Sequence, residues 1–335
     1  MKITCPRCGE PGYLTKVKVY GKHYMRVEHV EGGKRRVCYL GRDAGALRQH
    51  IESVLGSSSA EKIIRYAGGD YKIAGILRPR LERLCPQPRC TFVEVFGGSG
   101  YMAQTVPRAV FGNIIYNDIN DRLTALYKHI KENPEQLATI LSFLPYSRSY
   151  HRIVTKLMLA DREFGSLVAA ALAFYAYNSS IHGTSRGGFS YSVDPDHNEA
   201  KKFSSRISAV LKYAAAWKDI TIENLDFREV IKRYDAEKTV FYLDPPYVDR
   251  GKDYYGTPFT VDDLRHMASM LAQIRGRFLL KVDKKTYSKI SDILPPGRYA
   301  VEEFERKKNM VVVKGAQRDT WTMVLVSTPA QNAAD

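Results

Sequence analysis

The chain has 335 residues, of which 44% are hydrophobic, so it can bury a sizeable core in two or three domains and is not a disordered tail. No run approaches the roughly 18 apolar residues of a membrane span, and the N-terminus lacks the apolar core of a signal peptide, so we expect a cytoplasmic protein. A formal net charge of +15 favours a nucleic-acid partner, although a generally basic protein would show the same value.

The first 42 residues combine a C-x2-C pair, "CPRCGE", with a predicted β-hairpin. In a cytosolic protein such a pair is typical of a zinc site or a redox pair rather than a structural disulfide. The runs "YLTKVKVY" and "HYMRVEHV" flank Gly21-Lys22 and predict two antiparallel strands. We expect pairing about this turn to place His29 opposite Tyr13, near the cysteine pair, and His23 opposite Val19, near the hairpin tip.

These residues predict a zinc-ribbon-like module. Three cysteines and one histidine can close a tetrahedral structural Zn²⁺ site, which has no open position for catalysis. The expected metal ligands are Cys5, Cys8, His29 and Cys38. His23 is the weaker alternative to His29, and buried thiols with surface histidines are the alternative to a metal site.

A polar linker follows the module. The run "RDAGALRQHIESVL" predicts a short helix and "GSSSAEK" a linker, so we place a domain boundary before residue 63. Further along, Cys85 and Cys90 bracket "CPQPRC". We expect them to be core or loop residues, with a local disulfide as the alternative if the source is a hyperthermophile.

Beyond residue 63 the pattern alternates between strand and helix. "TFVEVFGGSG" is an apolar strand that enters a glycine turn, "NIIYNDIN" is a strand that ends in an acid, and "DRLTALYKHIKEN" is an amphipathic helix. This order predicts an α/β fold with a doubly wound, Rossmann-like sheet. Its ligand site is expected at the carboxyl ends of the strands.

The glycine turn "FGGSG" contains F-x-G-x-G, in which Gly98 and Gly100 allow the backbone to approach a ligand closely. Asp118 ends the next strand, where an acid can accept hydrogen bonds from two ribose hydroxyls. The pattern fits any adenosine cofactor. A nicotinamide dinucleotide is not excluded by the turn alone, because Ala103 satisfies the third position of the dinucleotide motif.

The stretch "YLDPPYV" distinguishes between cofactors, because it places an acid, two prolines and an aromatic ring at the end of the apolar strand "TVFYL". The Asp244 carboxylate and the Pro245 carbonyl can each accept one hydrogen of an aromatic amine, which turns its nitrogen lone pair towards an activated methyl group. Pro246 stiffens the turn, and Tyr247 offers a face on which an extruded base can stack. The alternative is a proline turn with a solvated acid.

With these motifs in this order, the chain resembles the Dam-like (alpha-class) family of DNA adenine N6-methyltransferases over about residues 63–327. "RYAGGDYKIAGIL" resembles the family's W-x-G-G-K segment, although Asp70 stands in place of the lysine, which Lys72 is able to replace. "LDFREVI" resembles the segment that contacts the cofactor's adenine. The resemblance implies S-adenosyl-L-methionine as cofactor, bound by Tyr66, Ala67, Gly68, Glu94, Phe96, Gly98, Gly100, Asp118, Asp226, Phe227 and Asp244.

The resemblance also implies a target-recognition insert, which is mainly helical by pattern and then breaks into the loop "SSIHGTSRGGFSYSVD". The residues expected to contact bases or phosphates are Asn178, Arg186, Tyr191, Lys201 and Lys202. The predicted domains are the module at 1–42, the helix and linker at 43–62, the cofactor-binding half at 63–133, the insert at 134–218, the catalytic half at 219–328 and a tail at 329–335.

Two further segments of the catalytic half attract attention. Residues 248–259 are polar and long enough to form a lid over a flipped base. Thr260 is expected to cap the following helix. Residues 306–318 carry five basic residues between the last two strands, where they either lie on DNA or form a solvated hairpin loop.

The predicted function is site-specific methylation of adenine N6 in double-stranded DNA, with Asp244, Pro245, Pro246 and Tyr247 as catalytic residues. An RNA or cytosine-N4 methyltransferase shares this mechanism and remains an alternative, as does a non-catalytic zinc-containing nucleic-acid-binding protein. Cytosine-C5 chemistry is disfavoured because no cysteine follows a proline. The sequence leaves open a cognate restriction endonuclease, the recognition sequence and the oligomeric state.

Overall fold

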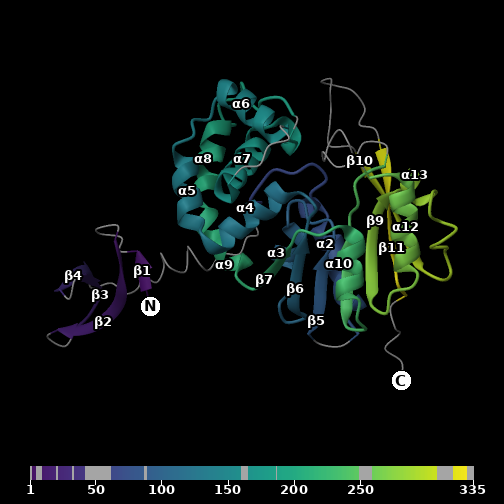
Figure 1. Cartoon of the computed structure of the whole chain (residues 1–335), viewed down its shortest axis with the longest axis horizontal. Helices are drawn as coiled ribbons and strands as arrows, with labels where there is room; N and C mark the ends of the chain where they lie inside the picture. Colours follow the sequence, from purple (N-terminus) through teal and green to yellow (C-terminus); the bar gives the residue numbers. More distant parts are fainter. Residues whose placement is uncertain are drawn as a thin grey trace. The chain divides into compact units, whose positions relative to one another are not determined.

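The computed structural model describes residues 2–4, 10–19, 22–31, 34–41, 62–86, 89–159, 165–185, 187–248, 259–307 and 320–329 (Figure 1). The chain divides into two compact units, residues 1–59 and 60–335. The predictions for Cys5, Cys8 and Arg186, for the helix and linker after residue 42, for the lid and for most of the basic connection at 306–318 fall outside the described residues. Among the helices that the structure describes, none combines the length and apolar character needed to cross a membrane.

The first unit is a four-stranded antiparallel sheet with the order β1-β2-β3-β4. Its strands are β1 (Lys2–Thr4), β2 (Pro11–Val19), β3 (Lys22–Glu31) and β4 (Lys34–Gly41). The predicted hairpin is therefore confirmed as β2 and β3. Val27 and His29 are both buried on β3, whereas Tyr13 on β2 is exposed.

The predicted register of this hairpin is wrong by one residue. Val19 pairs with Lys22 and Tyr13 with Glu28, so the two strands are joined by one residue fewer than the prediction assumed. His29 instead lies beside Gly12, where an added Cβ would stand 2.8 Å from His29 Nδ1. Because side chains alternate along a strand, a slip of one residue moves each of them to the other face relative to its partner.

His29 and Cys38 nevertheless share a face of this sheet. Val27 pairs with Cys38 across β3 and β4, and His29 lies two residues from Val27 on the same strand. Residues two apart on a strand, and residues directly opposite on neighbouring antiparallel strands, point to the same side. The two predicted zinc ligands that the structure describes therefore lie on one side of the sheet.

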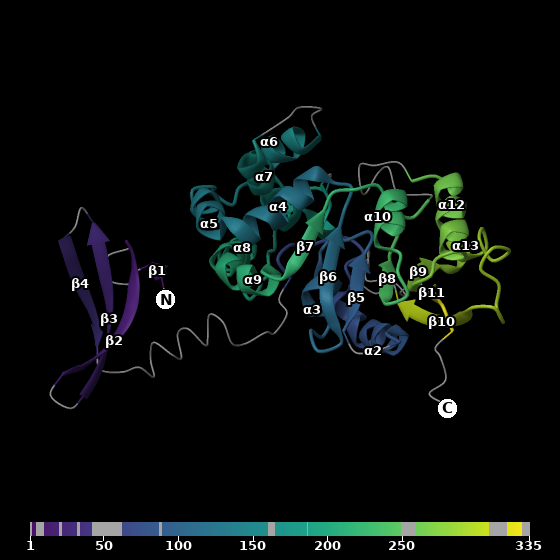
Figure 2. The same ribbon diagram turned by 60° about the horizontal axis from the view of Figure 1, so that its bottom comes forward.

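The second unit contains a seven-stranded mixed sheet with the order β10-β11-β9-β8-β5-β6-β7 (Figure 2). Its strands are β5 (Cys90–Glu94), β6 (Phe111–Asn117), β7 (Ile220–Glu223), β8 (Thr239–Leu243), β9 (Arg277–Asp283), β10 (Ala300–Lys307) and β11 (Thr320–Ser327). The pairs from β7 to β9 are parallel, and β11 runs antiparallel to both neighbours. The sheet is doubly wound and Rossmann-like, as predicted.

Alternate residues of the central strands enter two separate cores. Phe92 and Tyr242 pack on one face with α2 (Ala74–Leu84), α3 (Tyr101–Thr105) and α4 (Asp121–Glu132). Val93 and Phe241 pack on the other face with α10 (Phe227–Tyr234) and α12 (Val261–Leu271). Strands covered on both faces read as continuous apolar runs, which explains the composition of "TVFYL". The short α13 (Lys284–Tyr287) follows β9.

Helices fill the segment between α4 and β7, as the pattern predicted for the insert. They are α5 (Pro134–Ser142), α6 (Arg148–Leu159), α7 (Ser166–Ser179), α8 (Glu199–Ser208) and α9 (Val210–Trp217), with the one-turn η2 (Ile181–Gly183) after α7. Helix α7 is buried on nearly all sides from Ala169 to Ser179, and the other helices gather around it and α4 (Figure 1).

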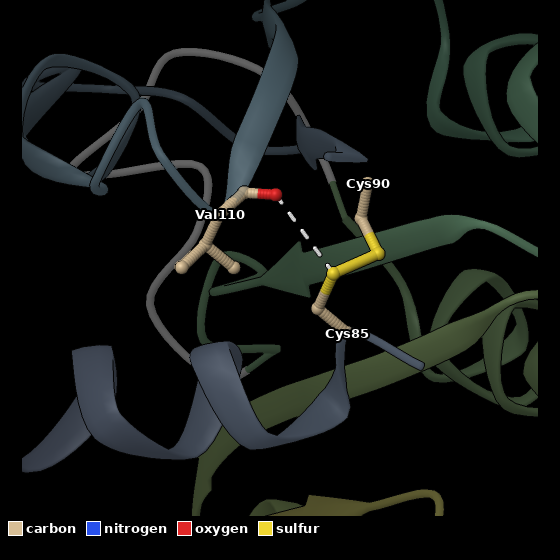
Figure 3. Close-up of a disulfide and its surroundings, with 3 residues drawn as sticks. All are labelled: Cys85, Cys90 and Val110. Atoms are coloured by element: carbon tan, nitrogen blue, oxygen red, sulfur yellow. Dashed lines mark hydrogen bonds between the residues drawn. A yellow bond between two sulfur atoms is a disulfide. The ribbon is translucent and has the colours of Figure 1, made fainter. Parts of the chain in front are cut away.

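Two local predictions are settled by the structure. Thr260 caps α12 in a capping box with Asp263, as expected. Cys85 and Cys90 form a disulfide, which was the alternative and not the favoured interpretation (Figure 3). The bridge joins the end of α2 to the first residue of β5. By loop closure alone it is expected to stabilise the fold by about 2 kcal/mol.

Candidate functional site

The largest group of predicted site residues meets at the carboxyl ends of β5, β6 and β8. Strand order reverses between β5 and β8, and open α/β sheets bind ligands at such a point. A hollow lies there, lined by residues from the ends of these strands and from the segment at residues 66–70. The predicted cofactor residues that line it are Tyr66, Ala67, Gly68, Glu94, Phe96, Gly98, Asp118 and Asp244.

The glycine turn is held in place by its neighbours. The hydroxyls of Tyr116 and Tyr127 donate to the Gly98 carbonyl at 3.1 and 3.2 Å. Gly98 has a φ of +48°, and a Cβ there would stand 2.6 Å from a ring carbon of Tyr66. A side chain at this position would therefore both strain the backbone and fill the wall of the hollow.

Gly100 has a different role from Gly98. It precedes α3 with a φ of +62°, and a Cβ there would lie 2.5 Å from the Trp217 ring. It is not among the residues that line the hollow. In this structure Gly100 therefore allows the insert's last helix to pack closely against the turn.

Asp118 is oriented by backbone groups. Its Oδ2 accepts from Gly98 N at 2.7 Å and its Oδ1 accepts from Asn120 N at 2.8 Å. Burial raises the pKa of this carboxyl to about 6, and the two N–H groups oppose that rise. Each oxygen keeps lone-pair capacity for another donor from the hollow.

A second hollow adjoins the first, and Phe96, Ile119 and Pro246 line both. Asp226 and Phe227, which the resemblance predicts to contact the cofactor's adenine, line the second hollow. The side chain of Asp226 caps α10 by accepting from Arg228 N. The two hollows therefore share part of their lining.

The D-P-P-Y segment follows β8 directly. Pro245 is buried, whereas Asp244, Pro246 and Tyr247 are partly exposed. Asp244 Oδ2 lies 2.5 Å from Lys281 Nζ. Burial raises the pKa of Asp244 to about 7, and the positive charge of Lys281 opposes this rise. Burial and the Asp244 charge also raise the pKa of Tyr247 to about 12, so its ring remains a neutral phenol.

Lys281 is a site residue that the sequence interpretation missed. Its ammonium group also pairs with Asp70, whose second oxygen accepts from Tyr242 OH at 2.6 Å. Lys72, the expected replacement for the family lysine, is exposed. One signal in the sequence could have identified it: a lysine among the apolar residues of the strand "RFLLKVD" indicates a buried charge that needs an acidic partner.

Glu94 is another buried acidic residue that lines the first hollow. Its Oε2 accepts from Ala103 N at 2.8 Å, in the first turn of α3. Burial, with smaller contributions from the charges of Asp70 and Asp244, holds its pKa well above the usual value. Four carboxyl groups, those of Asp70, Glu94, Asp118 and Asp244, therefore line one hollow, which favours a ligand that carries positive charge or hydrogen-bond donors.

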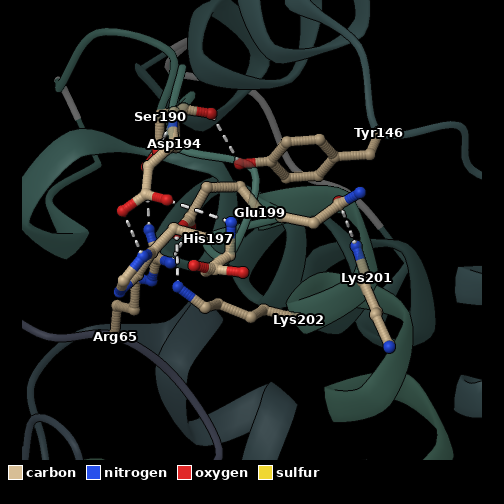
Figure 4. A network of polar contacts seen from close by, with 11 residues as sticks. Arg65, Tyr146, Ser190, Asp194, His197, Glu199, Lys201 and Lys202 are labelled. Carbon is tan, nitrogen blue, oxygen red and sulfur yellow. Dashed lines mark hydrogen bonds and ion pairs between the residues drawn. The ribbon is translucent and has the colours of Figure 1, made fainter.

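The wall of the hollow formed by residues 66–68 is joined to the helical insert by hydrogen bonds. Arg65 N donates to Asn178 Oδ1 at 3.2 Å and Ala67 N donates to the Gly183 carbonyl at 3.2 Å. The Arg65 side chain bonds Ser190 and pairs with Glu199 at the start of α8 (Figure 4). Asn178, a predicted DNA contact, is buried, and its amide nitrogen also bonds the Ile63 carbonyl, so here it joins two chain segments.

Three other predicted DNA contacts, Tyr191, Lys201 and Lys202, lie on the surface of the insert. The ring of Tyr191 is exposed and packs near the Arg148 guanidinium. Lys202 pairs with Glu199 (Figure 4). Lys201 and Lys202 line an open hollow with Lys62 and Arg206. Burial and the neighbouring cations lower the pKa of Lys62, a consequence of gathering several positive charges.

The predicted metal site is only half described. Cys5 and Cys8 lie outside the described residues, and within those that are described no group of three or more potential ligands gathers. The structure therefore supports a small antiparallel sheet but does not show a zinc site.

Comparison with known proteins bears on the site as a whole. The D12 class N6 adenine-specific DNA methyltransferase family matches residues 66–310. The chain belongs to this family. The match begins at Tyr66, which lines the hollow, and includes both the glycine turn and the D-P-P-Y segment. The chain is thus a member of a family of S-adenosylmethionine-dependent enzymes that methylate adenine N6 in DNA.

More distant likenesses are found among solved structures. Precorrin-6y C5,15-methyltransferase from Geobacter metallireducens GS-15 aligns over 82% of this chain and 98% of its own, with 10% identity and a TM-score of 0.35. A candidate methyltransferase from Thermoplasma acidophilum aligns over 96% of this chain and 98% of its own, with 10% identity and a TM-score of 0.28. Among curated proteins no match was found.

Proposed function

We propose that this D12-family chain is a site-specific DNA adenine N6-methyltransferase that acts on an adenine flipped out of duplex DNA. The observation that carries the proposal is the meeting of the glycine turn, the Asp118 carboxylate and Asp244 around one hollow. A base inside a duplex cannot reach such a hollow, so the target must leave the stack.

The hollow suits S-adenosylmethionine. Asp118 would accept from the ribose hydroxyls, Phe227 and Asp226 would hold the adenine in the second hollow, and the wall at residues 66–68 would contact the methionine part. When bound, the cofactor supplies a methyl group on positively charged sulfur, which keeps the bonding electron pair as the amine's lone pair forms the new bond. The acidic lining fits the positive charges of this ligand.

Asp244 and Pro245 would orient the target amine. The Asp244 carboxylate and the Pro245 carbonyl each accept one N–H, which directs the lone pair away from the ring and towards the methyl group. After transfer the nitrogen carries one surplus proton. A carboxyl with a pKa of about 7 can accept that proton and release it to solvent. Tyr247 would stack on the base, and Pro246 would stiffen the turn.

The insert would contact the DNA. Tyr191 is exposed, and the open hollow formed with Lys62 and Arg206 places Lys201 and Lys202 in a cluster of cations suited to phosphate groups. Arg186, in the same loop, stays a candidate for base contact. Asn178 is better suited to joining the insert to the cofactor wall, because its amide is already bonded on both sides.

We also propose a structural Zn²⁺ in the first unit, with Cys5 and Cys8 completing a site begun by His29 and Cys38. The support is that the two described residues share one face of the sheet. Metal analysis should find about one Zn²⁺ per chain, lost from a Cys5→Ser, Cys8→Ser variant. A protein made with zinc supplied that carries no metal and still folds through residues 10–41 would contradict this assignment.

Methyl transfer itself tests the function. The purified chain, given S-adenosylmethionine and duplex DNA, should produce N6-methyladenine, detected by mass spectrometry of the digested DNA. Asp244→Ala should lower the single-turnover rate by about 10³-fold or more while the cofactor still binds, because one of two oriented acceptors is lost.

Asp292→Ala is the matched control, since this aspartate is exposed and pairs with Arg265 outside the hollow. Its rate should equal that of the unchanged chain. RNA and cytosine-rich duplexes are the substrate controls. Methylated cytosine or RNA in place of methyladenine in DNA would overturn the assignment, as would an Asp244→Ala rate near the original.

A further inference from the structure

A buried lysine stands between two acids at the centre of the site. Lys281 Nζ contacts both Asp70 and Asp244, and only 5% of its side chain is exposed. The positive charge of Lys281 is therefore balanced by these two carboxylates. A buried ammonium needs such partners, because leaving it unpaired away from water is strongly unfavourable.

The sheet itself brings Lys281 to Asp244. Leu243 and Leu280 are paired across the parallel strands β8 and β9. The next residue on each strand is Asp244 and Lys281, so the carboxylate and the ammonium emerge side by side. The contact is thus set by strand register, and both groups lie on well-packed strands or their ends.

Asp70 completes the arrangement from outside the sheet. It opens the one-turn η1 (Asp70–Lys72), and its two oxygens bond Lys281 and Tyr242. With both oxygens engaged and 7% of its side chain exposed, Asp70 is suited to supporting the site and not to binding a ligand. Its position is the one at which the resembled segment carries a lysine.

We infer that Lys281 is a positioning residue for methyl transfer, which supplies from β9 the cation absent from position 70 and fixes the Asp244 carboxylate against the target amine. Lys281 occupies Oδ2 of Asp244. Among the described residues, no donor is recorded on Oδ1, so this oxygen is left to accept from the substrate. The inference rests on the proposed function and identifies Lys281 as the residue that positions Asp244.

The two neighbours of Asp244 act on its charge in opposite directions. The ammonium of Lys281 lowers the pKa of Asp244, whereas the negative charge of Asp70 raises it. Removing Lys281's charge should therefore make Asp244 harder to ionise, and removing Asp70's charge should make it easier. A purely structural ion pair would also shift the pKa of Asp244, but it would leave the pH dependence of methyl transfer unchanged.

The experiment compares Lys281→Met, which keeps an unbranched side chain one atom shorter and removes its charge, with Asp70→Asn. Single-turnover methylation is followed against pH at saturating cofactor and DNA. Lys281→Met should lower the rate at pH 7 at least tenfold and move the acid limb upwards by about one unit or more. Asp70→Asn should move the limb downwards. Lys284→Met, three residues along and 65% exposed, should change neither.

A charge exchange extends the test. Asp70→Lys combined with Lys281→Met returns the cation to position 70 and should recover much of the rate lost in Lys281→Met. Thermal melts report which variants fold. Asp70→Asn leaves Lys281 paired with Asp244, so its predicted downward shift remains measurable if Lys281→Met does not fold.

A titration separates this inference from the proposed function. The carboxyl carbon of Asp244, followed by ¹³C NMR in the ligand-free protein and assigned with Asp244→Asn, should show the same opposite shifts in pKa without requiring activity. An original chain that methylates no DNA overturns the proposed function alone. Unchanged titration and pH profiles in both variants overturn the role of Lys281.

Discussion

Asp118 follows β6 and Asp244 follows β8 in the same sheet, yet different groups orient the two carboxylates. Asp118 accepts two backbone N–H groups, at 2.7 and 2.8 Å, and no cation pairs with it among the described residues. Asp244 pairs with the buried Lys281. Backbone donors fix an acid with no cost of burying another charge, whereas a lysine can adjust the acid's proton affinity.

This difference fits the two roles proposed above, binding of the cofactor's ribose by Asp118 and orientation of the target amine by Asp244. An acid that only holds hydroxyl groups needs a fixed orientation, which the glycine turn and Asn120 give to Asp118. An acid that orients a reacting amine must also be ionised at the right pH, and a neighbouring charge controls that. Burial raises the pKa of both carboxyls, and at Asp244 the charges of Lys281 and Asp70 also act on it.

The distinction between the two acids fails if they have the same role. The variant Asp118→Ala is the strongest test of this distinction. Two hydrogen bonds to a charged acceptor are lost, so cofactor affinity should fall by about 100-fold or more, since each such bond contributes roughly 1.5 to 3 kcal/mol. The single-turnover rate at saturating cofactor should fall far less than in Asp244→Ala. Isothermal titration measures the first and methyl transfer the second.

DNA binding without cofactor is the control for this variant and should be nearly unchanged. Equal loss of DNA and cofactor affinity would instead indicate a folding defect. A large loss of transfer rate at saturating cofactor would show that Asp118 takes part in the chemical step, and the distinction between the two acids would fail.

A pH series sharpens the comparison with a smaller effect. Both carboxyls have raised pKa values, so each is protonated, and loses its acceptor form, as pH falls through that value. Methyl transfer should fall about tenfold per pH unit below pH 7, and cofactor affinity should begin to fall only below about pH 6. A transfer rate that stays level down to pH 5 would contradict the raised pKa of Asp244.

Much of the fold and part of the site could be predicted because their signals are local. The glycine turn, the acid of Asp118 and the D-P-P-Y segment each lie within a few residues of a recognisable strand, and strand ends meet at one edge of a parallel sheet. The apolar runs of β5 and β8 indicated strands covered on both faces.

The rest could not be predicted because it depends on distant pairing. Lys281 reaches Asp70 across 211 positions of the chain, which no local pattern encodes. The hairpin register was wrong by one residue because composition identifies both strands but not the length of their connection. The burial of Asn178 depends on its packing against residues 63 and 65, far away in sequence.

The tie between Ala67 and Gly183 has a consequence for how the two substrates influence each other. Gly183 has a φ of +64°, and a Cβ there would stand 2.4 Å from the Arg65 backbone, so the insert rests directly on the wall of the cofactor hollow. If filling the hollow tightens this contact, it favours DNA binding by some factor, and DNA must then favour the cofactor by the same factor. Gly183 thus lies at the contact through which the methyl donor and the methyl acceptor would influence each other's affinity.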